Sequence, residues 1–277
     1  MPITVPSPAG AKLTFDLTFW VSYVIGWTLT AIFQKEFMWN NNVTRVFKNY
    51  NICIGVDSFP AQPIAAITGT ISLSFFGLTV LTFWLHINDT SHFGYCKLRK
   101  AMFLISWLLT ITFMLTYAVP PDDATMTRIH VTGFQVGCYG YFLLQVLTIL
   151  EYTKFSDDPV TCSNRKGRIW LGAQFSLAIM LAAMAVYLTC ALAVVDLESI
   201  TADINSFVVP ASVSGGIVMT ESDVRVGWFG WLLVLAAGIG PIVSAFTQPE
   251  PFWLETAIVK PLDSDSAPLD SESASFD

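Results

Sequence analysis

Six long runs of apolar residues dominate this sequence of 277 residues, and none carries an Asp, Glu, Lys or Arg away from its ends. Each run is close to the roughly 20 residues that an α-helix needs to cross the hydrocarbon core of a bilayer. Membrane-spanning strands are excluded, because the runs lack strict apolar alternation over units of about ten residues. The sequence therefore predicts an all-α, polytopic membrane protein with a six-helix bundle. The predicted spans are residues 15–33, 62–87, 101–119, 129–152, 169–195 and 226–247.

Composition supports this class. Only 13% of the residues are charged and 53% are hydrophobic, whereas about a quarter of the residues in an ordinary soluble domain are charged.

We divide the chain into an N-terminal segment (1–14), a membrane domain (15–247) and a tail (248–277). Within the membrane domain, two loops of about thirty residues, 34–61 and 196–225, are predicted to lie on the lumenal or extracellular side.

The tail holds most of the net charge of -7, with seven acidic residues and one lysine. It has too little apolar content to pack, so we expect it to be disordered. The rest of the chain is nearly neutral and has no basic stripe of the kind that follows a nucleic acid backbone. Nucleic acid is therefore not an expected partner.

The distribution of basic residues predicts the orientation, because Lys and Arg in short loops favour the cytoplasmic side. Nine of the fourteen lie in the N-terminal segment, the loops after the second and fourth spans, and the tail. We therefore expect both termini to be cytoplasmic and the first span to be an uncleaved signal anchor. The opposite orientation stays open, since loop 34–61 alone carries three basic residues.

Two glycosylation sequons fall on opposite sides in this topology, so only one of them can meet the lumenal transferase. They are Asn42-Val43-Thr44 in the first loop and Asn88-Asp89-Thr90 in the second. The orientation selects Asn42 as the glycosylated residue. Asn88 also lies close to the membrane, and we expect it to be unmodified.

The fourth predicted span carries a stripe of small and polar residues along one face. At 100° per residue its members fall within an arc of roughly 120°. They are His130, Gly133, Gly137, Tyr141, Gln145, Thr148 and Tyr152.

Two interpretations of this stripe are open. In the first, Gly133 and Gly137 let a neighbouring backbone approach, while Tyr141 and Gln145 form hydrogen bonds across the contact. In the second, His130 and Gln145 line a polar cavity that holds a ligand or a lipid headgroup, because polar groups at membrane depth are costly without a use. His130 lies at the predicted helix end, where an imidazole is able to contact interfacial water.

The spans offer little other chemistry. Asp16 and Glu151 are placed at span boundaries, so the sequence lacks the buried charges typical of ion-coupled transporters and voltage sensors. The three histidines have no metal-ligand spacing, and we expect no metal or other cofactor. A lipid hydrolase or acyltransferase would need His130 with a lumenal acid. The candidate acids are Asp57, Asp122, Asp123, Asp196, Glu198 and Asp203.

Several local motifs resemble those of one family of six-helix membrane proteins. They are Lys97-Leu98-Arg99-Lys100-Ala101, then His130-Val131-Thr132-Gly133 with Gly137, Gly140-Tyr141, Gln145 and Tyr152, and also Asp57-Ser58-Phe59-Pro60 and Trp228. In their order along the chain these motifs are similar to the damage-regulated autophagy modulator family and the related FGF-receptor-activating-protein group. The resemblance implies a non-catalytic regulatory membrane protein of the lysosome, Golgi or plasma membrane. Some relatives are linked to lipid remodelling or to mechanosensitive currents.

These observations favour a non-catalytic, multi-pass membrane protein that acts as a regulator, adaptor or accessory subunit in the endomembrane system or plasma membrane. Its expected partners are membrane lipids and either another membrane protein or further copies of the same chain. Two alternatives stay open: a lipid-remodelling enzyme that uses His130, and a component of a pore.

Overall fold

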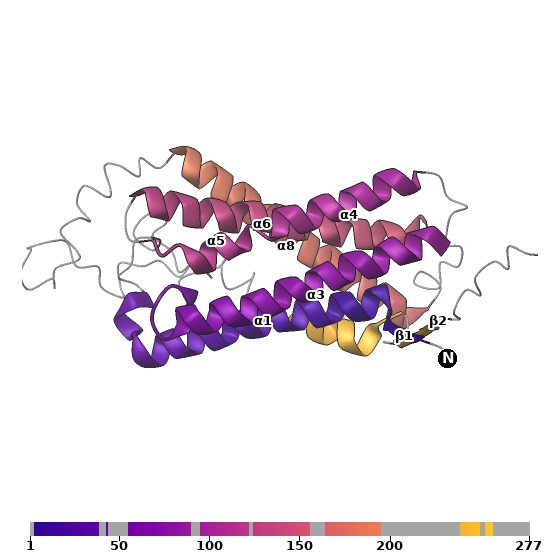
Figure 1. The fold of residues 1–277 in the computed structure, drawn as a ribbon, viewed down its shortest axis with the longest axis horizontal. Coiled ribbons are helices and arrows are strands. Elements are labelled where there is room, and N and C mark those ends of the chain that lie inside the picture. Colours follow the sequence, from indigo (N-terminus) through magenta and orange to yellow (C-terminus); the bar gives the residue numbers. More distant parts are fainter. Residues whose placement is uncertain are drawn as a thin grey trace, which may run out of the picture.

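The computed structural model describes residues 3–38, 43, 55–89, 95–121, 124–155, 164–194, 239–249 and 253–256. Its long helices run back and forth along one axis (Figure 1). They are α1 (Pro8–Phe33), α3 (Ala61–Asp89), α4 (Cys96–Thr110), α5 (Phe113–Ala118), α6 (Ala124–Thr153) and α8 (Arg165–Val194). The remaining described elements are η1 (Lys35–Met38), a short helix at 239–247, β1 (Ile3–Pro6) and β2 (Trp253–Thr256).

Within the part of the chain that the structure describes, five helical segments are long and apolar enough to cross a membrane, which confirms the helical fold class and is consistent with a multi-pass membrane protein. They begin and end close to five of the predicted spans, with α4 and α5 together forming the third. Of the sixth predicted span, only 239–247 lies among the described residues, and it is helical. Asn42, Trp228, loop 196–225 and most of the tail lie outside the described residues.

The first helix starts earlier than the sequence predicts. The structure begins α1 at Pro8 rather than at residue 15. The Ser7 side chain accepts a hydrogen bond from the Gly10 backbone N–H (3.0 Å), and Pro8 occupies the first turn, where its missing N–H is not needed. Lys12 and Asp16 therefore lie inside the helix, and this corrects the placement of Asp16 at a span boundary.

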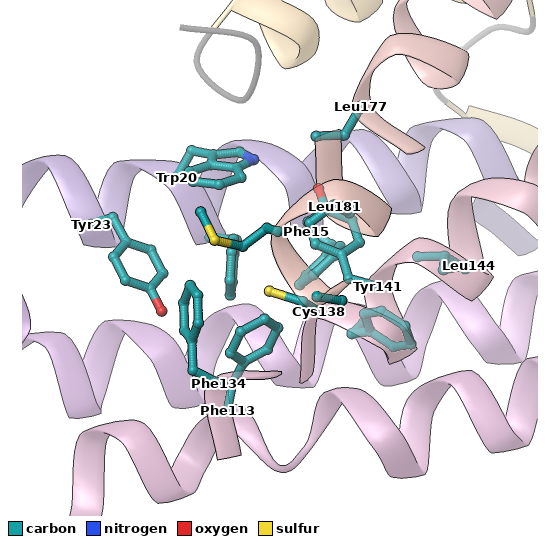
Figure 2. Close-up of a cluster of buried hydrophobic side chains, with 14 of the residues drawn as sticks. Phe15, Trp20, Tyr23, Phe113, Phe134, Cys138, Tyr141, Leu144, Leu177 and Leu181 are labelled. Carbon is teal, nitrogen blue, oxygen red and sulfur yellow. The ribbon is translucent and has the colours of Figure 1, made fainter. Parts of the chain in front are cut away.

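α6 occupies the centre of the bundle. It contacts α4 and α5 on one side and α8 on another, while α1 and α3 pack together along the opposite side (Figure 1). At mid-height the interior is filled by aromatic rings, labelled in part in Figure 2. Phe15 on α1 lies 5.0 Å from Tyr141 on α6, and Phe19 lies 5.1 Å from Phe113 on α5, between ring centroids. These rings form the shared core of the described helices.

Three glycines of α6 face the joint between α4 and α5, where the helix is interrupted at Ile111 and Thr112. A Cβ added at Gly140 would lie 2.5 Å from the Thr110 backbone nitrogen, and one at Gly137 would lie 2.7 Å from the Phe113 ring. One added at Gly133 would lie 2.8 Å from the Thr112 carbonyl oxygen. The Thr112 hydroxyl in turn donates to the Gly133 carbonyl (3.0 Å). Close backbone approach therefore requires glycine at these positions.

Two short strands depart from the all-α expectation. β1 pairs antiparallel with β2, with Ile3 opposite Thr256 and Pro6 opposite Trp253. Residues 253–256 belong to the segment that we predicted to be a disordered tail, and here they are ordered by backbone pairing with the other end of the chain. The Gln248 amide also lies 3.5 Å from the Ser7 hydroxyl. The end of helix 239–247 is thus held beside the start of α1.

We expect Gly140→Ala to lower stability by about 1–3 kcal/mol, because the new methyl group meets backbone atoms that have no rotamer with which to yield. Gly172→Ala on α8 is the matched control, since a Cβ there would meet nothing within 4 Å. Thermal unfolding of the purified protein in detergent measures both. Equal stability of the two variants would contradict close packing of α6 on the α4–α5 joint.

Candidate functional site

The polar and small stripe of α6 faces into the bundle. All seven of its members, from His130 to Tyr152, are buried. His130 is completely buried, so the expectation that its imidazole meets interfacial water is wrong. The helix begins at Ala124, which leaves His130 inside it rather than at its end.

Three buried clusters of polar side chains follow one another along α6. They centre on His130, Tyr141 and Glu151, which are separated along the helix by about 16 Å and about 15 Å at 1.5 Å per residue. Each of the three contacts a charged residue from a different part of the chain. α6 is therefore the element that arranges the polar chemistry of the described bundle.

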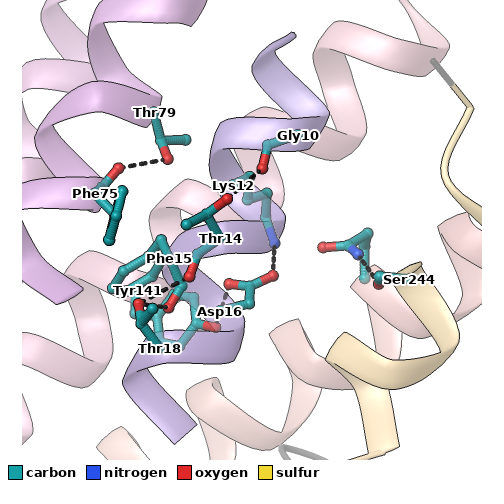
Figure 3. Close-up of polar contacts among 11 residues, drawn as sticks. Gly10, Lys12, Thr14, Phe15, Asp16, Thr18, Phe75, Thr79, Tyr141 and Ser244 are labelled. Carbon is teal, nitrogen blue, oxygen red and sulfur yellow. Dashed lines mark hydrogen bonds and ion pairs between the residues drawn. The ribbon is translucent and has the colours of Figure 1, made fainter. Parts of the chain in front are cut away.

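The middle cluster is buried between two candidate membrane-spanning helices and joins α1 to α6 (Figure 3). The Lys12 ammonium donates to Asp16 Oδ2 (2.6 Å), and the Tyr141 hydroxyl donates to Asp16 Oδ1 (2.5 Å). The Lys12 and Asp16 side chains are 1% and 2% exposed. A buried ion pair is stabilised when additional hydrogen bonds satisfy the remaining lone pairs and protons of its two groups. The Tyr141 hydroxyl supplies one such hydrogen bond to the carboxylate.

Sequence reasoning missed the role of Lys12 and Asp16, although a signal was present. Their i, i+4 spacing is the spacing at which opposite charges pair on one helix face. Within an apolar helix, such a pair neutralises itself and allows the helix to continue. The predicted start at residue 15 separated the two residues and concealed the pattern.

The second cluster joins the start of α4 to the end of α6. Arg99 forms a bidentate ion pair with Glu151. Its Nε donates to Oε1 (2.8 Å), and its Nη2 donates to Oε2. The guanidinium also lies 4.3 Å above the centre of the Phe155 ring. Arg99 and Glu151 are 4% and 3% exposed. Planar pairing with a carboxylate and stacking on a ring are both specific to arginine.

The third cluster lies at the opposite end of α6. His130 Nδ1 lies 2.8 Å from the Val119 carbonyl oxygen, and His130 Nε2 lies 3.5 Å from Asp57 Oδ1. Asp57 is one of the six acids that the sequence offered as partners for His130. The other five acids, at positions 122, 123, 196, 198 and 203, lie outside the described residues.

The segment that carries Asp57 packs over the end of α1. The Thr30 hydroxyl donates to the Gly55 carbonyl (2.9 Å) and lies 3.0 Å from the Ser58 hydroxyl. Gly26 allows this approach, because an added Cβ would lie 2.8 Å from the Gly55 carbonyl oxygen. The contacts with α1 hold Asp57 against α6.

The contacts of the His130 ring restrict its chemistry. A carbonyl only accepts hydrogen bonds, so Nδ1 carries a proton and donates it to Val119. Nε2 faces the carboxylate of Asp57, and this contact is attractive only when one of the two groups is protonated. A catalytic histidine instead pairs one nitrogen with the carboxylate and directs the other at the nucleophile. In this structure the Val119 carbonyl takes the place of the orienting carboxylate, and Nε2 faces Asp57 at 3.5 Å without forming a hydrogen bond.

Gln145 differs from the prediction that it hydrogen bonds across the helix contact. It is completely buried, yet neither its amide nitrogen nor its oxygen has a hydrogen-bond partner within the part of the chain that the structure describes. Among those same residues, no group of three or more His, Cys, Asp or Glu side chains is arranged to hold a metal ion.

No protein-family model, no curated protein and no solved structure matches this sequence.

We expect Arg99→Ala to lower the free energy of unfolding by about 3–5 kcal/mol, because Glu151 would keep a buried charge without its partner. Arg168→Ala is the control. It removes the same charge from an exposed position on α8, where the effect should be small. Denaturant titration of both variants in mixed micelles measures the difference. Equal losses in the free energy of unfolding would show that the buried ion pair stabilises the fold no more than an exposed arginine does.

Proposed function

We propose that this chain is a non-catalytic, multi-pass membrane protein that acts as a regulator, adaptor or accessory subunit of another membrane protein. In this proposal it crosses the membrane six times, its termini are cytoplasmic, and Asn42 is glycosylated. It resides in the endomembrane system or the plasma membrane. The motifs that resemble the autophagy-modulator family agree with such a role.

The arrangement of buried polar groups supports a non-catalytic role. Lys12 and Arg99 are each paired with a carboxylate inside the bundle, His130 Nδ1 bonds to the Val119 carbonyl, and His130 Nε2 is buried facing Asp57. These groups hold helices together and do not face an open site. A protein built in this way acts through its surface.

A group of polar side chains on the outer face of α6 and α8 carries the proposal. The Gln135 amide donates to the Thr189 hydroxyl (2.7 Å), and the Tyr139 hydroxyl lies 3.0 Å from the same oxygen. Thr189 is exposed, and all three residues lie within membrane-spanning segments. Polar groups facing lipid are costly, and in membrane proteins they commonly bind a neighbouring helix. We call Gln135, Tyr139 and Thr189 the outer polar patch.

The outer polar patch gives a direct test. We expect the double variant Gln135→Leu with Thr189→Val to lose co-purifying membrane proteins in a pull-down from mild detergent, because it removes two of the three hydrogen-bonding side chains of the patch. Mass spectrometry of the captured chains, normalised to the bait, measures the loss. Val186→Leu, on the exposed face of the same helix, is the control and should retain the partners.

Two results would contradict this assignment. One is a wild-type protein that purifies alone from mild detergent. The other is a patch variant that unfolds, which circular dichroism and size-exclusion chromatography would detect. If the captured chains are copies of the protein itself, the patch is the contact of a homo-oligomer, and the accessory role fails.

A lipid-remodelling enzyme is the second candidate, and the His130–Asp57 contact favours it, since histidine paired with a carboxylate is common in hydrolases. Under the proposed non-catalytic role, we expect His130→Ala to lower the thermal stability and to leave the cellular lipid profile equal to that of wild type. The opposite result, a fold of normal stability with lost lipid turnover, would favour the enzyme. Lipid mass spectrometry beside thermal unfolding separates the two.

A further inference from the structure

A larger group of buried polar side chains includes the Lys12–Asp16 pair of the middle cluster and four residues that none of the clusters above contains. Its members come from four helices: α1, α6, α8 and the helix at 239–247. We call it the polar layer, and no member is more than 2% exposed. It consists of Lys12, Asp16, Gln145, Thr148, Gln174 and Ser244.

Contacts between the helices bring these residues to within about two turns of one another along α6. On α1 and α6, which are antiparallel, Asp16 meets Tyr141, so Lys12 and Gln145 lie one turn beyond that contact on the same side. On α6 and α8, the Tyr152 and Trp170 rings are 5.0 Å apart. The same antiparallel register sets Thr148 level with Gln174.

The short helix at 239–247 completes the layer. The Gln174 amide donates to the Ser244 hydroxyl (2.8 Å), and one turn later Gln248 contacts Ser7 at the start of α1. These two contacts bring Ser244 level with Lys12. In Figure 3, Asp16 lies between Tyr141 on one side and Ser244 on the other.

Several polar atoms of the layer lack hydrogen bonds within the described part of the chain. They include the amide nitrogen and oxygen of Gln145, the hydroxyl of Thr148 and the amide oxygen of Gln174. Lys12 has three N–H donors, and one is directed at Asp16. Such groups, when fully buried, are almost always satisfied by protein or by ordered water.

We propose that the polar layer binds water, which bridges Lys12 to Gln145, Thr148 and Gln174. The unsatisfied groups include both donors and acceptors, so they fit a small neutral molecule that does both. An anion would be repelled by the amide oxygens of Gln145 and Gln174, and a cation would be repelled by the Lys12 ammonium. Burial of every member excludes a lipid headgroup. Buried water typically makes about three such bonds.

Bound water gives the layer a structural consequence. The Lys12–Asp16 pair is stabilised at membrane depth by a hydrated environment instead of a dry one. The water also links α1, α6, α8 and helix 239–247 through shared hydrogen bonds, so the loss of one bridging group weakens the contacts of the other helices.

The isosteric variant Thr148→Val tests the proposal. If water bridges the hydroxyl, its removal breaks the network, and we expect the Tm in detergent to fall by several degrees. If the hydroxyl is dry and unsatisfied, its replacement by a methyl group raises the Tm or leaves it unchanged, and either result overturns the proposal. Thr153→Val on the same helix is the control, because that hydroxyl bonds only to the Ile149 carbonyl within α6.

A measurement on the unmodified protein provides an independent check. In solid-state NMR of the full chain in bilayers of deuterated lipid, magnetisation is transferred from water to nearby protein sites. We expect the Gln145 side-chain amide, assigned by its loss in Gln145→Leu, to receive this transfer before the neighbouring Leu144 and Leu147 methyl groups. Transfer to Gln145 no faster than to those leucines would overturn the proposal.

Discussion

The scarcity of water in the hydrocarbon core is the constraint on which this structure depends. A polar group buried there must find its partner within the protein, and in this chain most of those partners meet along one face of α6. Its stripe brings Tyr141 to Asp16 and His130 to Asp57, while Glu151 beside the stripe pairs with Arg99. Of the other helices, α1, α3 and α8 each place a side chain against this face. These polar contacts join α6 to neighbouring elements, while apolar burial and tight packing hold other pairs such as α1 and α3 together.

Glycine makes that arrangement possible. Polar side chains on α6 reach their partners only if the surrounding helices come close, and the three glycines from Gly133 to Gly140 let the α4–α5 joint approach the α6 backbone. The interruption at Thr112 follows from the same contact, since the Thr112 hydroxyl bonds to the Gly133 carbonyl. Close packing and hydrogen bonding on α6 therefore depend on each other, because the short distance between the α6 backbone and the α4–α5 joint allows the polar contacts to form.

A structure that directs its charged groups inward has consequences for function. The Arg99–Glu151 and Lys12–Asp16 pairs are closed within the bundle, and His130 is buried with its Nδ1 bonded to the Val119 carbonyl. Chemistry of this kind stabilises a defined arrangement of helices, which agrees with the proposed role as a regulator, adaptor or accessory subunit. The outer polar patch on α6 and α8 is the place where polar groups face outward instead. In the polar layer around the Lys12–Asp16 pair, hydrogen bonding by the described side chains alone is incomplete.

The sequence by itself determined the membrane class, the approximate bounds of five spans and the buried face of α6. These follow from hydropathy and from the period of the helix, both of which are local properties. The Lys12–Asp16 ion pair could also have been predicted, because the spacing of four residues is a local signal in the sequence. Only the tertiary structure decided that Arg99 pairs with Glu151, that Asp57 faces His130 and that β1 pairs with β2. Those partners are far apart in the chain, and their meeting depends on the register between helices, which side-chain packing sets and no short stretch of sequence encodes.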